Sequence, residues 1–143
     1  MKLNTGKKAF LVEFDNGDAQ TIYFNPNDPD LMIRLKNFES RVSEKINKFE
    51  DVELTQEGKP SQTAQIEIFE KMQNILKEDL DFAFGGDVSQ VVFRHCSPFA
   101  IIDGEYFVIQ FVKAVAPEIE RLIKEENEKM DQKADKYLNK YQK

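Results

Sequence analysis

The sequence predicts an α+β fold, in which an N-terminal β-hairpin packs on a layer of about four helices and a C-terminal amphipathic helix follows. Two patterns support this prediction. Two short runs near the N-terminus alternate apolar and other residues with the period of a strand, and later segments repeat apolar residues at helical spacing. The length of 143 residues suits one domain, which we expect over residues 1–123, with an amphipathic tail over 124–143.

The hairpin is predicted from the runs Lys7–Asp15 and Ala19–Phe24. Alternate residues of both runs form one apolar face, which we expect to lie against a core. The members of this face are Phe10, Val12, Phe14, Ile22 and Phe24. Asn16-Gly17 stands between the runs, and this pair favours the positive φ angles of a type I′ turn.

A first long helix is predicted to begin at Pro29, because Asp28 is a good N-cap and proline suits the first helical position. One apolar stripe runs along this helix through Leu31, Leu35, Phe38, Val42, Ile46 and Phe49. A turn is expected at 57–60, where the sequence is Glu-Gly-Lys-Pro.

A second helix follows, with Ser61 or Thr63 as its expected cap. Its apolar stripe consists of Ile66, Phe69, Met72, Leu76 and Leu80. Gly85-Gly86 should end this helix, with one glycine in the left-handed conformation.

Two further elements are predicted after the glycines. Asp87 and Gln90 resemble a capping box for a short helix, from Val88 to about His95. The segment Phe99–Ile102 reads equally as a strand or a buried loop. Asp103-Gly104 marks either a turn or the cap of a long last helix. The apolar period of this helix continues across Pro117, where we expect a kink because proline removes one hydrogen bond and clashes with the preceding turn.

The residues that carry most enzyme chemistry are scarce in this chain. Its one histidine, His95, is adjacent to its one cysteine, Cys96, and neighbouring side chains on a helix diverge by about 100°. Together they supply too few ligands for zinc. Asp79 and Asp81 are two residues apart, which is poor spacing for shared acid–base work on a helix, so we expect a solvated acidic patch. The sequence therefore predicts no enzyme, no catalytic residue, no cofactor and no metal.

Composition narrows the partners. A net charge of −6 disfavours a nucleic-acid surface, because binding to phosphates needs clustered Lys and Arg. No apolar run approaches the roughly 20 residues that cross a bilayer, and the N-terminus has no signal-peptide pattern. A single cysteine fits a reducing compartment. We therefore expect a soluble, cytoplasmic protein that binds neither nucleic acid nor membrane.

Two groups of apolar residues are candidates for protein contacts. The first belongs to an aromatic-rich segment, in which Phe82 and Phe84 flank the inward position Ala83, so that one of them should reach the surface. The second is a stripe along the tail, which can dock on its own domain, pair with a second copy or bind a partner helix. The candidate residues are Phe82, Phe84, Phe93, Phe99, Met130, Tyr137, Leu138 and Tyr141.

The order of these parts resembles the small tail-assembly chaperones of long-tailed bacteriophages and prophages. The resemblance covers about Leu11 to Lys124 and includes the hairpin, Phe84-Gly85-Gly86, Val92-Phe93 and the motif at 104–107, Gly-Glu-Tyr-Phe, before an amphipathic helix. It implies a protein of the host cytoplasm that binds and shields the tape-measure protein before the tail tube polymerises. The alternative is a small structural or adaptor subunit of a phage tail or another assembly.

Overall fold

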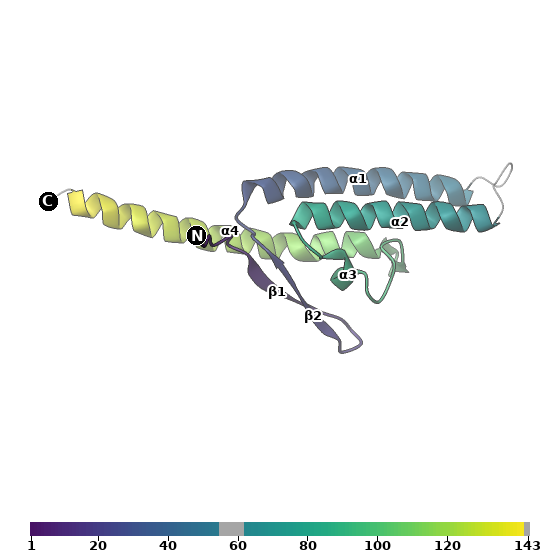
Figure 1. Cartoon of the computed structure of the whole chain (residues 1–143), viewed down its shortest axis with the longest axis horizontal. Helices are drawn as coiled ribbons and strands as arrows, with labels where there is room; N and C mark the ends of the chain where they lie inside the picture. Colours follow the sequence, from purple (N-terminus) through teal and green to yellow (C-terminus); the bar gives the residue numbers. More distant parts are fainter. Residues whose placement is uncertain (55–61, 142–143) are drawn as a thin grey trace.

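Helices α1 (Pro29–Leu54), α2 (Gln62–Phe84) and the first half of α4 (Phe107–Tyr141) lie side by side, and the N-terminal hairpin crosses this layer (Figure 1). The structure is a computed structural model that describes residues 1–54 and 62–141, apart from the side chains at 49, 51–54, 62, 140 and 141. The α+β fold predicted from the sequence is confirmed. The predicted turn at 57–60 and the cap at Ser61 lie outside the described residues.

The hairpin pairs β1 (Lys8–Glu13) with β2 (Ala19–Phe24) in antiparallel register, with Phe10 opposite Ile22. The predicted apolar face is confirmed, since Ile22 and Phe24 are buried and the Phe10 ring stacks on Phe24 at 4.0 Å. β1 ends before Phe14, so that residue belongs to the loop and not to the strand.

The turn of this hairpin differs from the prediction. Within the loop 14–18, all of which the structure describes, only Gly17 has a positive φ, at 89°. The Gly17 N–H donates to the Phe14 carbonyl at 3.1 Å, and the Phe14 N–H donates to the Asp18 carbonyl at 2.9 Å. Phe14 and Asp18 therefore close a three-residue loop, residues 15–17, with a bulge at Gly17, so the predicted type I′ turn is wrong. The extra residue leaves Asn16 with an ordinary negative φ.

The start of α1 and the end of α2 are confirmed. The Asp28 carboxylate accepts a hydrogen bond from the Asp30 N–H at 3.0 Å, and Pro29 is the first helical residue. Gly85 ends α2 with a φ of 73°, and its N–H and that of Gly86 both donate to the Asp81 carbonyl.

The stripes of both helices are mostly as predicted. Leu31, Phe38 and Val42 of α1 are buried, and the side chain of Phe49 lies outside the described set. In α2 the residues Met72, Leu76, Leu80 and Ala83 are buried. Ile66 is 50% exposed and does not belong to this stripe. It lies near the start of α2, at the end of the helical layer remote from the hairpin (Figure 1).

The short helix α3 (Ser89–Val92) is held by a residue outside it. The Asp81 carboxylate, at the end of α2, accepts hydrogen bonds from the Val88 N–H at 2.9 Å, the Ser89 N–H at 2.7 Å and the Ser89 hydroxyl at 2.7 Å. The predicted capping box is therefore wrong, because Asp81 already takes the donors that Asp87 would have bound. The helix is also shorter than predicted and ends before His95.

The ambiguous segment after α3 is partly strand. Phe99 is buried in a loop, and β3 (Ile101–Ile102) pairs with β4 (Glu105–Tyr106). The two residues between these strands both have positive φ, 52° for Asp103 and 79° for Gly104, as a type I′ turn requires. α4 then begins at Phe107 and continues across Pro117 as one helix.

Candidate functional site

The one histidine of the chain, His95, contacts residues at the tip of the first hairpin. His95 Nε2 lies 2.7 Å from Asp18 Oδ2, and its Nδ1 lies 3.3 Å from the amide nitrogen of Asn16. Arg94 Nε lies 3.0 Å from the same Asp18 oxygen, and the Phe14 ring meets the imidazole edge-on at 4.7 Å. The hydrogen bond from His95 is the main cause that lowers the pKa of Asp18 below its ordinary value of 3.8. These contacts join two segments that are distant in sequence.

The cysteine is poorly suited to nucleophilic chemistry. Cys96 is half-buried, and burial raises the pKa of its thiol, with a further contribution from the nearby charge of Asp15. A thiol with a raised pKa stays protonated near neutral pH, and the reactive species is the thiolate.

Two of the acidic residues near the end of α2, Asp79 and Asp81, have structural partners, so the solvated patch that was predicted there with Glu78 is reduced to Glu78, which is exposed. Asp79 pairs with Arg41 of α1 at 2.6 Å, and Asp81 binds the start of α3. Among residues 1–54 and 62–141, no group of three or more His, Cys, Asp or Glu side chains could hold a metal ion. Over the same part of the chain, no helix has the length and apolar character of a membrane span.

Three of the predicted contact residues are core residues. Phe84, Phe93 and Phe99 are all buried, and each packs against another aromatic ring. Their predicted role in partner binding is therefore wrong, because their rings are already covered by the hairpin, α4 and β4. The sequence contains more aromatic residues here than short elements were expected to bury, but Phe24 of the hairpin, Phe107 of α4 and Tyr106 of β4 pack against the three rings.

Phe82 is the member of the aromatic-rich segment that reaches the surface. It is 67% exposed, while its neighbour Phe84 is buried, which confirms that one of the two lies outside the core. The Arg34 guanidinium lies over its ring, 5.1 Å from the centroid. This contact covers one face of the ring and occupies part of its surface.

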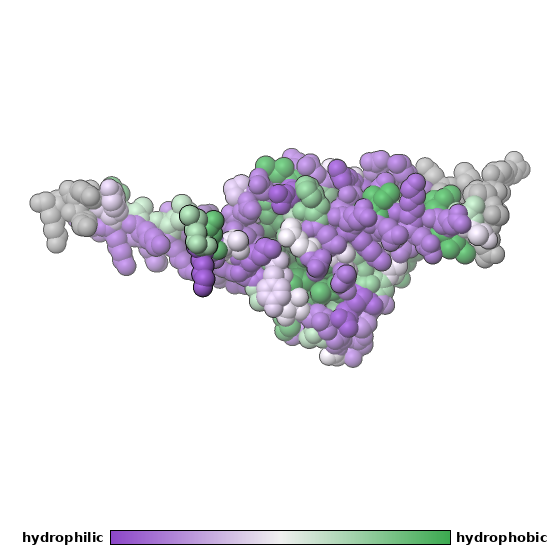
Figure 2. Space-filling model, viewed as in Figure 1, coloured by the Kyte–Doolittle hydropathy of each residue, from purple (hydrophilic) through white to green (hydrophobic). Residues whose placement is uncertain are grey.

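The predicted tail is the outer half of α4, which we call the stalk (residues 124–141). It extends away from the rest of the molecule, past the start of the hairpin (Figure 1). Every side chain from 127 to 139 is exposed, including Met130 at 66%, Tyr137 at 63% and Leu138 at 54%. Patches of apolar colour lie along it in Figure 2. The side chain of Tyr141 lies outside the described set.

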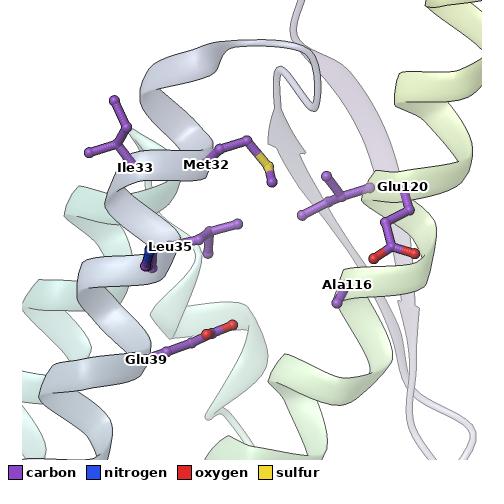
Figure 3. A pocket seen from close by; sticks show the side chains of 8 residues that line it. Met32, Ile33, Leu35, Glu39, Ala116 and Glu120 are labelled. Atoms are coloured by element: carbon purple, nitrogen blue, oxygen red, sulfur yellow. The ribbon is translucent and has the colours of Figure 1, made fainter.

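A groove between α1 and α4 adjoins the stalk, and we call it the α1/α4 groove. Its volume is about 530 Å³ (Figure 3). Its lining is mainly apolar, with a few charged residues: Met32, Ile33, Leu35, Lys36, Glu39, Ala116, Ile119 and Glu120. Met32 and Ile33 are 49% and 60% exposed. Sequence reasoning missed these two, although their signal was visible: they are large apolar residues beside the buried stripe of α1.

The groove and the stalk share one face of α4. Ile119 lines the groove. By the helical period, Ile119, Met130 and Tyr137 lie within about 20° of one another around the helix axis. Ile123 and Ala134 lie on the same side, between the other members. We call this continuous row the α4 face. It begins in the body of the protein and runs out along the stalk.

Comparison of the chain with protein-family models, with curated protein sequences and with solved structures finds no match.

Proposed function

We propose that this chain is a non-enzymatic protein-binding factor that holds an apolar-faced helix of a client along the α4 face. The observation that supports the proposal is the exposed row of apolar side chains on the stalk, continuous with an apolar groove in the body. A row of this kind is typical of surfaces that bind a partner helix. Met130 and Met32 are flexible side chains that adapt to different apolar partners.

The client we propose is the tape-measure protein of a long-tailed phage, and the chain acts as a tail-assembly chaperone in the host cytoplasm. A tape-measure chain is long, largely helical and apolar on one face, so it needs cover before the tail tube forms around it. The net charge of −6 supports this role, because excess negative charge keeps a complex with an apolar client dispersed. A chaperone leaves once the tail is complete, whereas a structural or adaptor subunit stays in the finished particle.

Co-expression with the tape-measure protein of the same phage tests this proposal. The full chain should co-purify with the client, and a variant that ends at Ile123 should not, although its melting temperature stays close to that of the full chain. Leu11→Ser is the matched control, because Leu11 is 62% exposed but lies on the outer face of the hairpin. A shortened chain that binds the client as well as the full chain contradicts the proposal.

The same assay separates binding from catalysis. His95→Ala and Cys96→Ala should retain client binding, because neither side chain belongs to the α4 face. Loss of function in either variant, with the fold intact by circular dichroism, would indicate chemistry at this pair and contradict a purely binding role.

A further inference from the structure

We infer that in the absence of a client the α4 face binds the stalk of a second copy of this chain, so that the free protein is a two-fold dimer with antiparallel stalks. The second copy would occupy the same surface as the client, and in this respect the inference rests on the proposed function. A client would then displace the second copy. The charges that flank the α4 face favour a second copy as the occupant.

The α4 face has the spacing that lets two helices wrap around each other. Four of its members, Ile123, Met130, Ala134 and Tyr137, belong to a series that recurs at alternating steps of four and three, the period at which residues stay in contact along a paired helix. The whole series is Ala116, Glu120, Ile123, Asn127, Met130, Ala134 and Tyr137, in which Glu120 and Asn127 are polar. Lys124 and Asp131 flank this row on one side, and Glu126 and Lys133 flank it on the other.

One antiparallel register pairs these flanking charges favourably. When Ala134 of one copy lies opposite Ile123 of the other, Lys124 faces Asp131 across one side of the pair. On the opposite side Glu126 faces Lys133. The two-fold axis repeats each contact, which gives four pairs of opposite charge per dimer. Flanking pairs of this kind set the partner and the orientation of paired helices.

The other registers place like charges together. A shift of one heptad in one direction brings Asp131 to Asp131 and Lys133 to Lys133 of the other copy. A shift in the other direction brings Lys124 to Lys124 and Glu126 to Glu126. A parallel pair sets Glu126 beside Asp131. Because like charges across a pair disfavour that arrangement, the pattern selects the single antiparallel register.

The same register brings the stalk of the second copy to the α1/α4 groove. Tyr137 of one copy then lies opposite Glu120 of the other, at the edge of the groove lined by Met32 and Ile33. The tyrosine ring covers apolar surface there. Figure 3 shows Met32, Ala116 and Glu120 around the space that this ring would enter. One occupant therefore accounts for both the exposed stalk and the open groove.

Charge reversal in the full chain, followed by sedimentation equilibrium, tests the inference. The native chain should be a dimer whose dissociation constant rises with salt concentration. Lys124→Glu and Asp131→Lys should each weaken it by roughly tenfold or more, since each turns two attractive pairs into repulsive ones. An equimolar mixture of the two variants should restore the dimer, because every pair then joins opposite charges. Lys136→Glu, on the outer side of the stalk, is the matched control and should leave the dimer unchanged.

Two results would overturn the inference: a native chain that remains monomeric at all concentrations, or a mixture that associates no better than its separate variants. Circular dichroism of each variant checks that the stalk remains helical. A failed dimer would leave the proposed function standing, because co-purification with the client is measured separately. Failure of the client assay with an intact, charge-dependent dimer would instead assign the α4 face to self-association alone.

Discussion

The two halves of α4 have the same apolar period but different surroundings. In the first half, Val108 and Ile119 are 0% and 3% exposed, because they belong to the core cluster that also contains residues of the hairpin, α1 and α2. In the second half, Met130 and Tyr137 lie on the same side of the helix and are exposed. Periodicity in the sequence therefore identifies an apolar face, but whether that face is buried depends on elements elsewhere in the chain or on another molecule.

The difference between the halves is also one of stability. A helix in the body gains from burial of its apolar stripe, whereas an isolated helix of the length of the stalk is marginal in water. Where α4 leaves the body, Arg121 bonds to Glu118 at 3.0 Å and to Glu125 at 2.8 Å, exposed pairs that support the helix only weakly. The stalk therefore gains most from a partner along its apolar face.

The sharpest test of this comparison substitutes matched positions in the two halves. Ile119→Ala should lower the free energy of unfolding by about 2–5 kcal/mol, because it removes buried methyl groups and leaves a cavity. Met130→Ala should change it by less than about 0.5 kcal/mol in dilute solution, since that side chain is exposed. Denaturant unfolding measures both. Equal effects would mean that the stalk is part of the core.

A second test addresses the joint that holds α3 to α2 in the body, for which the stalk has no counterpart. Asp81→Ala should cost about 2–3 kcal/mol, because three donors near the start of α3 lose a charged acceptor. Asp87→Ala is the control suggested by the sequence pattern, and it should cost less than about 0.5 kcal/mol because Asp87 is exposed. A larger effect at Asp87 would restore the capping box that the structure replaces.

Acid should weaken the body slightly. The pKa of Asp18 is lowered, first by the hydrogen bond from His95, so its ionised form is favoured in the folded state. Its contribution to stability is therefore complete above pH 3.8 and is lost as the pH falls below that value through the lowered pKa. Melting temperatures across this range should fall more for the native chain than for Asp18→Asn. If the melting temperatures of the two proteins fall in parallel with pH, the His95 contact does not contribute to stability.

Local signals in the sequence were enough to predict several elements. The cap at Asp28, the stop at Gly85 and the apolar face of the hairpin each depend on residues close together in the chain, and the structure confirms all three. Interactions between distant residues were beyond such reasoning. Asp81 binds Ser89 only because Gly85 turns the chain back, so a capping pattern next to α3 was preferred by mistake.

The two hairpins show that the turn residues alone do not determine the type of turn. Asn16-Gly17 and Asp103-Gly104 have the same preference for a type I′ turn, yet only the second pair adopts it. At the first pair the loop contains one more residue, which brings Asp18 to the Arg94 and His95 side chains and Phe14 to the imidazole ring. A long-range anchor therefore accompanies the longer loop there, and no pattern within the hairpin signals it.

The site was predictable in part for the same reason. The exposure of the stalk residues Met130, Tyr137 and Leu138 agrees with a tail stripe that is not needed for the core. The α1/α4 groove was missed, because it forms only where α4 passes the first turns of α1, and neither helix reveals this crossing alone. Phe93 and Phe99 were misplaced because the depth of the core depends on the packing of α4 and β4 around them.

The unbroken course of α4 across Pro117 also sets a length. A helix advances about 1.5 Å per residue, so the stalk holds its far end roughly 25 Å from the body along a direction that the buried half of α4 fixes. Where several copies line up along one long client, this rod would act as a spacer between neighbouring bodies. The number of copies per client would then be set by the client's length divided by this spacing.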